Sequence, residues 1–228
     1  MTSRLFTSAA LAGLVAGALA FLLTTWLLVP LIVTAELFES GALTHFVTTA
    51  NGAIETPVPT VDILAEPARH AGTFAMSLVT YVGFALLLAV SIALAERTAG
   101  LATDARRGLV WGLAGFAAVH LAPAAGLPPE LPGTVAAELG ARQAWWIVTV
   151  GASVAGIAML AFVRGPLAVL GVALIAAPHL WGAPHLDTYF GVAPPELAAT
   201  FAARSLAVAG ASWAILGASL GWLWAREG

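Results

Sequence analysis

Six long apolar runs dominate this sequence, and the stretches between them hold nearly all of its charged residues. The runs are 5–33, 72–94, 108–125, 143–163, 167–181 and 198–224. Hydrophobic residues make up 60% of the 228 residues and charged residues only 9%, against about 25% charged in an ordinary soluble domain. One soluble core cannot bury so much apolar surface, whereas a bilayer accepts about 20 apolar residues per helix. We therefore expect an all-α integral membrane protein, with a bundle of about six transmembrane helices in a single domain over residues 1–228.

The first apolar run has two interpretations. It begins like a secretory signal, because Arg4 precedes it and Ala18-Leu19-Ala20 resembles a cleavage site. It continues to Val33, however, which is longer than the apolar part of a signal peptide. The length favours a retained helix. Small residues at Ala9, Gly13 and Gly17 lie four apart on it, and this spacing predicts a closely packed helix neighbour.

The placement of arginine predicts the orientation. All nine basic residues are Arg, and positive charge gathers on the cytoplasmic side of membrane proteins. With the N-terminus inside, six lie at inner ends of helices: Arg4, Arg97, Arg106, Arg107, Arg164 and Arg226. Three lie outside: Arg69, Arg142 and Arg204. We therefore expect both termini in the cytoplasm and a multi-pass protein of the cytoplasmic (inner) membrane.

Two stretches of the second half resemble each other. Residues 120–131 read HLAPAAGLPPEL, and residues 178–197 read PHLWGAPHLDTYFGVAPPEL. In both, His-Leu closes an apolar run and Pro-Pro-Glu-Leu precedes the next run. The match aligns His120 with His179, Glu130 with Glu196, and Arg142 with Arg204. It predicts two related helical hairpins, one over 108–163 and one over 167–224.

The expected topology places all five histidines at outer helix ends or in outer loops, including the long loop 34–71. Nine of the twelve acidic residues fall on the same side. Imidazole together with carboxylate suits Co²⁺, Ni²⁺ and Zn²⁺, and the acidic groups attract any cation. The candidate metal-binding residues are His120, His179, His185, Glu130, Glu196 and Asp187.

Simpler roles for these residues stay open. A histidine at a helix end often makes only an interfacial hydrogen bond, and Glu130 and Glu196 suit the first turn of a helix. Arg142 and Arg204 are candidate ion-pair partners of these two glutamates. Whether His45 and His70 in the long outer loop bind metal is not decided by the sequence.

Several functions are excluded or disfavoured. The chain has no cysteine, so disulfides, thiolate metal sites and cysteine nucleophiles are excluded. It has no basic run, which argues against nucleic acid as a partner. It has no P-loop motif for ATP hydrolysis. We expect neither an enzyme nor a tightly bound cofactor.

Four stretches carry a resemblance to a known family. They are GLAGFAAVHLAP (112–123), GLPPELPG (126–133), LGARQAWW (139–146) and APHLWGAP (177–184). These closely resemble the CbtA family of proposed cobalt transporter subunits. The resemblance implies an integral membrane protein linked to cobalt uptake and cobalamin metabolism. It also implies a small single-span partner, CbtB-like, with a His-bearing tail.

Two functions remain from the residues and the resemblance together. The first is a membrane permease, or permease subunit, that captures a divalent transition-metal cation through outer histidines and carboxylates. Co²⁺ is the first candidate for the transported ion, with Ni²⁺ and Zn²⁺ next. The second is a non-transporting metal-binding or assembly subunit of a membrane complex.

Overall fold

The computed structural model describes residues 2–56, 58–188 and 191–226, and it is helical almost throughout. The helices are α1 (Thr2–Leu27), α2 (Val29–Glu39), α3 (Pro67–Ala99), α4 (Ala105–Phe116), α5 (Ala122–Ala124), α6 (Leu139–Phe162), α7 (Val169–Trp181) and α8 (Pro195–Arg226). A π-helical turn, η1 (Ala117–Leu121), joins α4 to α5, and a 3-10 turn, η2 (Pro166–Ala168), precedes α7. Strands β1 (Val47–Thr48) and β2 (Ile54–Glu55) form a small antiparallel hairpin.

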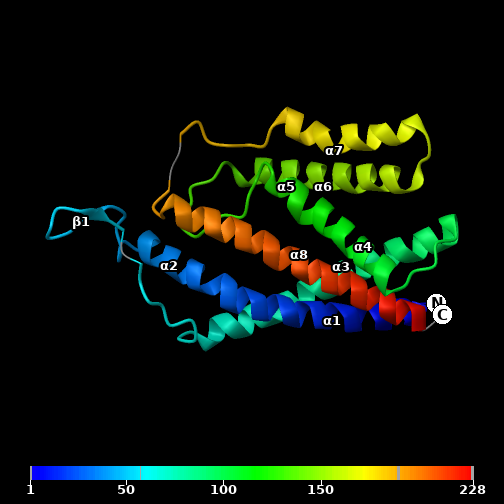
Figure 1. Cartoon of the computed structure of the whole chain (residues 1–228), viewed down its shortest axis with the longest axis horizontal. Coiled ribbons are helices and arrows are strands. Elements are labelled where there is room, and N and C mark those ends of the chain that lie inside the picture. Colours follow the sequence, from blue (N-terminus) through cyan, green and yellow to red (C-terminus); the bar gives the residue numbers. More distant parts are fainter. Residues whose placement is uncertain (1, 57, 189–190, 227–228) are drawn as a thin grey trace.

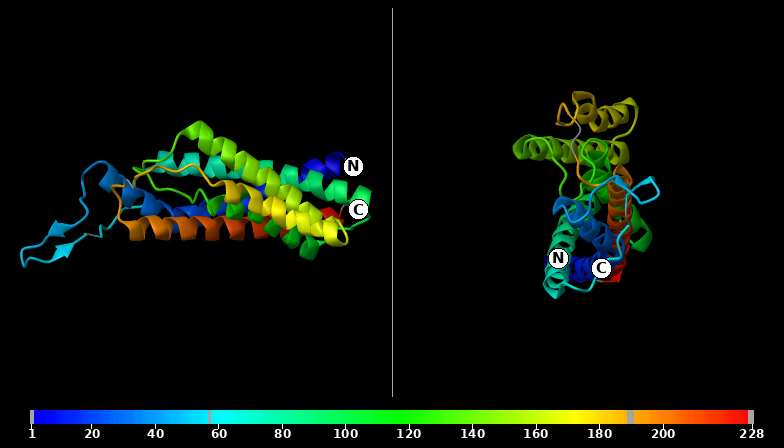
Figure 2. Two further views of the ribbon diagram at one scale, coloured as in Figure 1. Left: turned by 90° about the horizontal axis from the view of Figure 1, so that it is seen from above. Right: turned by 90° about the vertical axis from the view of Figure 1, so that its left-hand side faces the viewer.

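Helices α1, α3, α4 and α8 form the main bundle, and α6 and α7 form a layer beside it (Figures 1 and 2). Helix α1 packs on α3 and on α8, and α4 packs along α8. The start of α1 and the end of α8 lie at one end of the bundle, while the β1–β2 hairpin projects from the other end (Figure 1). We call the hairpin end the outer end.

The helices of the two expected hairpins exchange partners. Helix α4, from the first hairpin, packs on α8 of the second, and α7 of the second packs on α6 of the first. Helix α6 also contacts η1 and α5, and these contacts attach the α6–α7 layer to the main bundle. The contact of α4 with α8 therefore joins helices far apart in the sequence, whereas α6 and α7 are consecutive.

Glycines let these helices approach one another closely. A Cβ atom on Gly13 would lie only 2.5 Å from the Cα of Val82, and one on Gly17 would meet the same helix, α3. The close helix neighbour predicted for this face is confirmed. On α8, a Cβ on Gly217 would lie 2.2 Å from the carbonyl oxygen of Gly108. Backbone therefore touches backbone at both helix pairs.

The first apolar run is not one uninterrupted helix. Helix α1 ends at Leu27, and α2 begins at Val29 with Pro30 in its first turn. Proline has no N–H, so it leaves a carbonyl of the preceding turn without its helical donor. The guanidinium of Arg204 on α8 donates a hydrogen bond of 3.3 Å to the carbonyl oxygen of Leu27, which lies in this last turn of α1. The break in the run is thus bonded to a second helix.

Four helices are long and apolar enough to cross a membrane. They are Leu5–Leu27, Pro67–Ala99, Leu139–Phe162 and Pro195–Arg226. The other two expected spans correspond to the interrupted helix α4–η1–α5 and to a shorter apolar helix, Pro166–Trp181. The long outer loop is shorter than expected, because α2 continues to Glu39 and α3 begins at Pro67. The chain is an all-α, multi-pass membrane protein.

Candidate functional site

A groove of about 600 Å³ opens between α1, α3, η1 and α8. Small apolar residues form part of its wall, but half a dozen hydroxyl groups and one imidazole also line it. Its polar lining residues are Thr24, Arg69, Thr73, Ser77, Thr80, Tyr81, His120 and Ser205. The hydroxyl of Ser205 is buried and has no hydrogen-bond partner in the described part of the chain.

The groove follows α3 inward from the outer end. Arg69 lies in the first turn of α3, and Tyr81 lies twelve residues further along the same helix. At the rise of an α-helix this separation is about 18 Å. The hydroxyl of Tyr81 forms a hydrogen bond with Ser212 of α8. The groove thus runs from a charged outer end to an inner end that is lined by Tyr81 and His120.

His120 lies in the π-helical turn η1, a kind of turn that often occurs at functional sites. The indole nitrogen of Trp213 donates a hydrogen bond to its Nδ1 at 3.2 Å. The ring of Phe84 lies edge-on to the imidazole, with 5.9 Å between centroids. An indole nitrogen can only donate, so Nδ1 carries the lone pair. The proton of the neutral imidazole is therefore on Nε2.

His179, which the sequence match aligns with His120, has a different polar environment. It lies in the last turn of α7, beside Trp145 of α6, with 5.7 Å between ring centroids. The indole nitrogen of Trp145 donates to the carbonyl of Pro178 at 3.1 Å, and not to the imidazole. Both histidines thus lie against a tryptophan of the partner helix, but only His120 accepts its hydrogen bond.

The two outer loops of the second half meet at the outer end. A backbone bridge joins Thr134 of the first loop to Gly191 of the second. His185 and Asp187 lie in the second loop and are both exposed. Glu196 is exposed in the first turn of α8, where a carboxylate suits the helix dipole. These three groups face solvent at the outer surface.

One of the two expected glutamate–arginine pairs is present. Glu130 forms an ion pair with Arg142, so the prediction for this pair is confirmed. Arg204, the aligned residue, donates instead to the carbonyl of Leu27. No ion pair between Arg204 and Glu196 is found among the described residues. Arg142 and Arg204, although aligned in the repeat, therefore bind different partners.

The structure does not bring the six sequence-predicted metal-binding residues together. Of the six, only His120 lines the groove. Within residues 2–56, 58–188 and 191–226, no three His, Cys, Asp or Glu side chains lie close enough to hold a metal ion. Any tightly coordinated ion would need hydroxyl or carbonyl oxygens, water or groups from another chain as well.

A comparison with protein families shows to which family the chain belongs. The model of a family described as probable cobalt transporter subunit (CbtA) matches residues 2–225. The chain belongs to the CbtA family. Neither the curated proteins nor the solved structures contained a match. The family description makes a CbtA chain a subunit, which implies a partner in the transporter.

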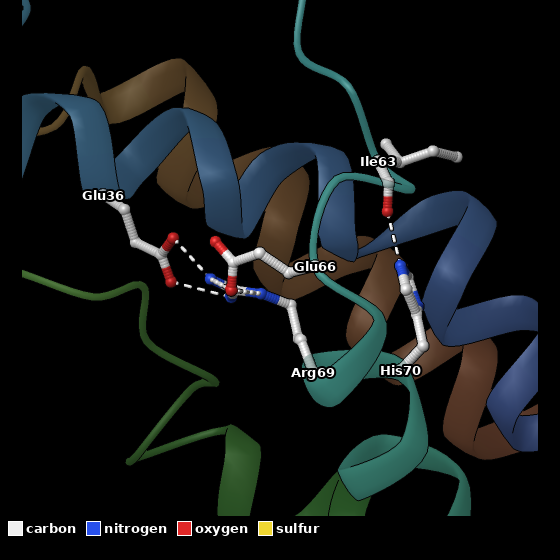
Figure 3. A network of polar contacts seen from close by, with 5 residues as sticks. All are labelled: Glu36, Ile63, Glu66, Arg69 and His70. Carbon is white, nitrogen blue, oxygen red and sulfur yellow. Dashed lines mark hydrogen bonds and ion pairs between the residues drawn. The ribbon is translucent and has the colours of Figure 1, made fainter.

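This CbtA chain has a second polar cluster that sequence reasoning missed, at the outer end of the groove (Figure 3). The guanidinium of Arg69 holds Glu36 through two hydrogen bonds of 2.8 and 2.9 Å, and it also pairs with Glu66 at 3.3 Å. Beside it, His70 bonds to the carbonyl of Ile63. The cluster ties α2, α3 and the segment between them together. No sequence signal links Glu36 to Arg69, because their separation has no helical or strand period.

The CbtA chain also caps α6 with a charged side chain. The carboxylate of Glu138 accepts hydrogen bonds from the backbone N–H groups of Gly140 and Ala141, at 2.8 and 2.7 Å. These two bonds hold the pKa of Glu138 below its ordinary value. They favour the ionised form at neutral pH and fix the start of the helix that carries Trp145.

Proposed function

We propose that this CbtA chain is a permease subunit for a divalent transition-metal cation, with Co²⁺ as its first substrate, and that the ion enters through the groove between α1, α3 and α8. One observation carries the proposal. Hydroxyl groups line the groove within an otherwise apolar bundle, and an imidazole lies at its inner end. Oxygen and imidazole nitrogen are both ligands for a borderline divalent ion.

The length of the groove along α3 supports a path for an entering ion. Its lining extends about 18 Å along α3 between Arg69 and Tyr81. The hydrocarbon core of a bilayer is about 30 Å thick. An ion that reaches Tyr81 and His120 has therefore covered more than half of the apolar layer while still in contact with polar groups.

The proposed topology has six crossings with both termini in the cytoplasm, and five of the six helices are long enough to cross an ordinary bilayer. The interrupted helix from Ala105 to Ala124 has 20 residues, enough for about 30 Å. The helix Pro166–Trp181 has 16, about 24 Å, and it would span only a locally thin bilayer. With this topology the groove opens to the outside of the inner membrane.

The outer groups are proposed to collect ions before they enter. His179, His185, Asp187 and Glu196 lie on or near the outer surface and raise the local cation concentration. Glu130 contributes less, because Arg142 neutralises it. No tightly bound cofactor is part of the proposal: the metal is the transported substrate.

A partner subunit is proposed to complete the coordination. Among the residues that the structure describes, His120 is the one imidazole that lines the groove, and a divalent ion that leaves water needs further strong ligands. A small single-span subunit with a His-bearing tail, CbtB-like, would supply them. The membrane potential favours inward movement of a divalent ion by about 4.6 kcal/mol per 100 mV, so ATP hydrolysis is not required.

Uptake of Co²⁺ into proteoliposomes tests the proposal. The chain with the single-span subunit should accumulate Co²⁺ when the lumen is made negative, and His120→Gln should lower the initial rate at least tenfold. His45→Gln is the matched control, because His45 bonds to Thr56 in the outer hairpin, away from the groove. Equal uptake by His120→Gln and the wild type would refute the route. Binding of Co²⁺ without any uptake would favour the non-transporting assembly subunit instead.

A further inference from the structure

The hydrogen bond between Trp213 and His120 has the opposite polarity from that of a prepared metal site. A ligating histidine normally donates the N–H of its second ring nitrogen to a carboxylate, carbonyl or water. That donation leaves the lone pair on the nitrogen that faces the metal. Here the second nitrogen, Nδ1, accepts a hydrogen bond from Trp213 at 3.2 Å. The lone pair of Nδ1 accepts the indole N–H, and the imidazole proton is on Nε2.

The indole of Trp213 is held firmly in this position. Its residue is only 3% exposed, and the ring of Phe84 packs on it with 4.7 Å between centroids. On the other side it occupies the space above Gly115, where a Cβ atom would lie 2.2 Å from the indole ring. The backbone of Trp213 also abuts Gly112. The contact with His120 is therefore fixed by packing on two helices.

The aligned histidine provides an internal comparison. At His179 the neighbouring indole, that of Trp145, donates to the carbonyl of Pro178. That contact leaves both nitrogens of His179 outside its hydrogen bond. A tryptophan next to a histidine thus fixes the imidazole proton in one half of the chain and not in the other.

We infer that Trp213 is a positioning residue that keeps His120 in the tautomer unable to bind an ion through Nε2, so that metal capture requires release of this hydrogen bond. The inference rests on the proposed role of His120 as a ligand. When an ion binds, the proton leaves Nε2 and returns to the ring at Nδ1, and Nε2 donates its lone pair to the metal. Nδ1–H can then no longer accept from Trp213. No net proton is released, and the cost of the broken bond raises the threshold for binding.

The imidazole tautomer is the first measurement, because it needs neither metal nor transport. In the protein labelled with ¹⁵N at histidine, one imidazole should show a bare Nδ1 and a protonated Nε2, and this signal should vanish in His120→Gln. In Trp213→Phe, where Nδ1 loses its donor, the same histidine should show a larger share of the Nδ1–H form. A proton on Nδ1 of His120 in the wild type, or an unchanged tautomer in Trp213→Phe, would overturn the inference whatever the transport result.

Metal affinity is the second measurement. With the single-span subunit present, diamagnetic Zn²⁺ should change the His120 signal to the Nδ1–H form in the wild type. Trp213→Phe should bind Co²⁺ about two- to tenfold more tightly, the range given by one neutral hydrogen bond, as followed by the visible absorption of Co²⁺. Trp145→Phe is the matched control and should leave the His120 tautomer unchanged. Unchanged or weaker Co²⁺ binding by a folded Trp213→Phe variant would contradict the inference. If the wild type binds no metal at His120, the proposed function fails while the tautomer result still stands.

Discussion

The guanidinium of Arg69 holds the carboxylate of Glu36 through two hydrogen bonds, of 2.8 and 2.9 Å, at the outer end of the groove. This fork joins the first turn of α3 to the last turns of α2 across 33 residues. It also neutralises Arg69, the one arginine that the described residues contribute to the groove lining, which lowers the repulsion that an entering cation meets.

Arg69→Lys should weaken this junction, because an ammonium group cannot reproduce the planar, two-bonded fork. Since both side chains are partly exposed, we expect a loss of only about 1 kcal/mol in the free energy of unfolding. The connection 40–66 should become more sensitive to protease. Arg106→Lys, at the opposite end of the bundle, is the control and should change neither property. Equal protease resistance in Arg69→Lys and the wild type would mean that the fork does not order this segment.

Gly217→Ala should damage the contact between α4 and α8. The new methyl group would lie 2.2 Å from the carbonyl oxygen of Gly108, so the helices must separate, at a cost of about 1–3 kcal/mol. Gly83→Ala is the matched control: it is also a helical glycine, and a Cβ atom there meets nothing within 4 Å. Thermal unfolding in detergent should separate the two variants, with the control equal to the wild type or up to about 1 kcal/mol more stable. Equal melting temperatures for both would contradict the backbone contact.

Glu138→Gln should lower stability at pH 7, and the difference should shrink in acid. The hydrogen bonds from Gly140 and Ala141 hold the folded pKa of Glu138 below its ordinary value. The ionised cap therefore adds stability above the unfolded pKa of about 4.3, and this stability is lost as the pH falls through the lower, folded pKa. Melting temperatures of both proteins, measured between neutral pH and about pH 3, test this. A difference that grows in acid would contradict the assigned cap.

Glu96 links two helices at the inner end of the bundle. Its carboxylate accepts a hydrogen bond of 2.8 Å from the indole nitrogen of Trp224, and a weaker one from the backbone of Thr103. Glu96→Ala leaves the buried indole without this acceptor, at a cost of about 1–3 kcal/mol. Glu96→Gln keeps an acceptor oxygen and should lose less. Thermal unfolding of the two variants would show equal losses if the hydrogen bond contributes nothing.

Properties that depend on local sequence were predictable. The apolar runs gave the helical membrane class, the small residues Ala9, Gly13 and Gly17 indicated the close contact with α3, and the repeat indicated the pair of Glu130 with Arg142. Each of these follows from a helical period or from a short separation along the chain.

Properties that depend on tertiary contacts were not predictable. Nothing in the repeat indicates that α4 pairs with α8, that Arg204 bonds to the break after Leu27, or that Trp213 donates to His120. Aligned residues such as Arg142 and Arg204 have unlike partners because each repeat meets different neighbours. The sequence singled out His120, which lines the groove, but the position of its proton depends on a residue 93 positions away.

The central claim is that the groove is a water-filled entrance for cations from the outer side, and the natural absence of cysteine allows a direct test. Single cysteines would replace Thr80 and Thr73, which line the groove, and the neighbouring Val79, which is 68% exposed on α3 but outside the groove. A charged, membrane-impermeant thiol reagent added from the outside should modify the Thr80→Cys and Thr73→Cys proteins, and Co²⁺ should slow both reactions. The Val79→Cys protein, facing lipid, should stay unmodified. Equal reaction at all three positions, or groove cysteines that do not react from outside, would contradict the account.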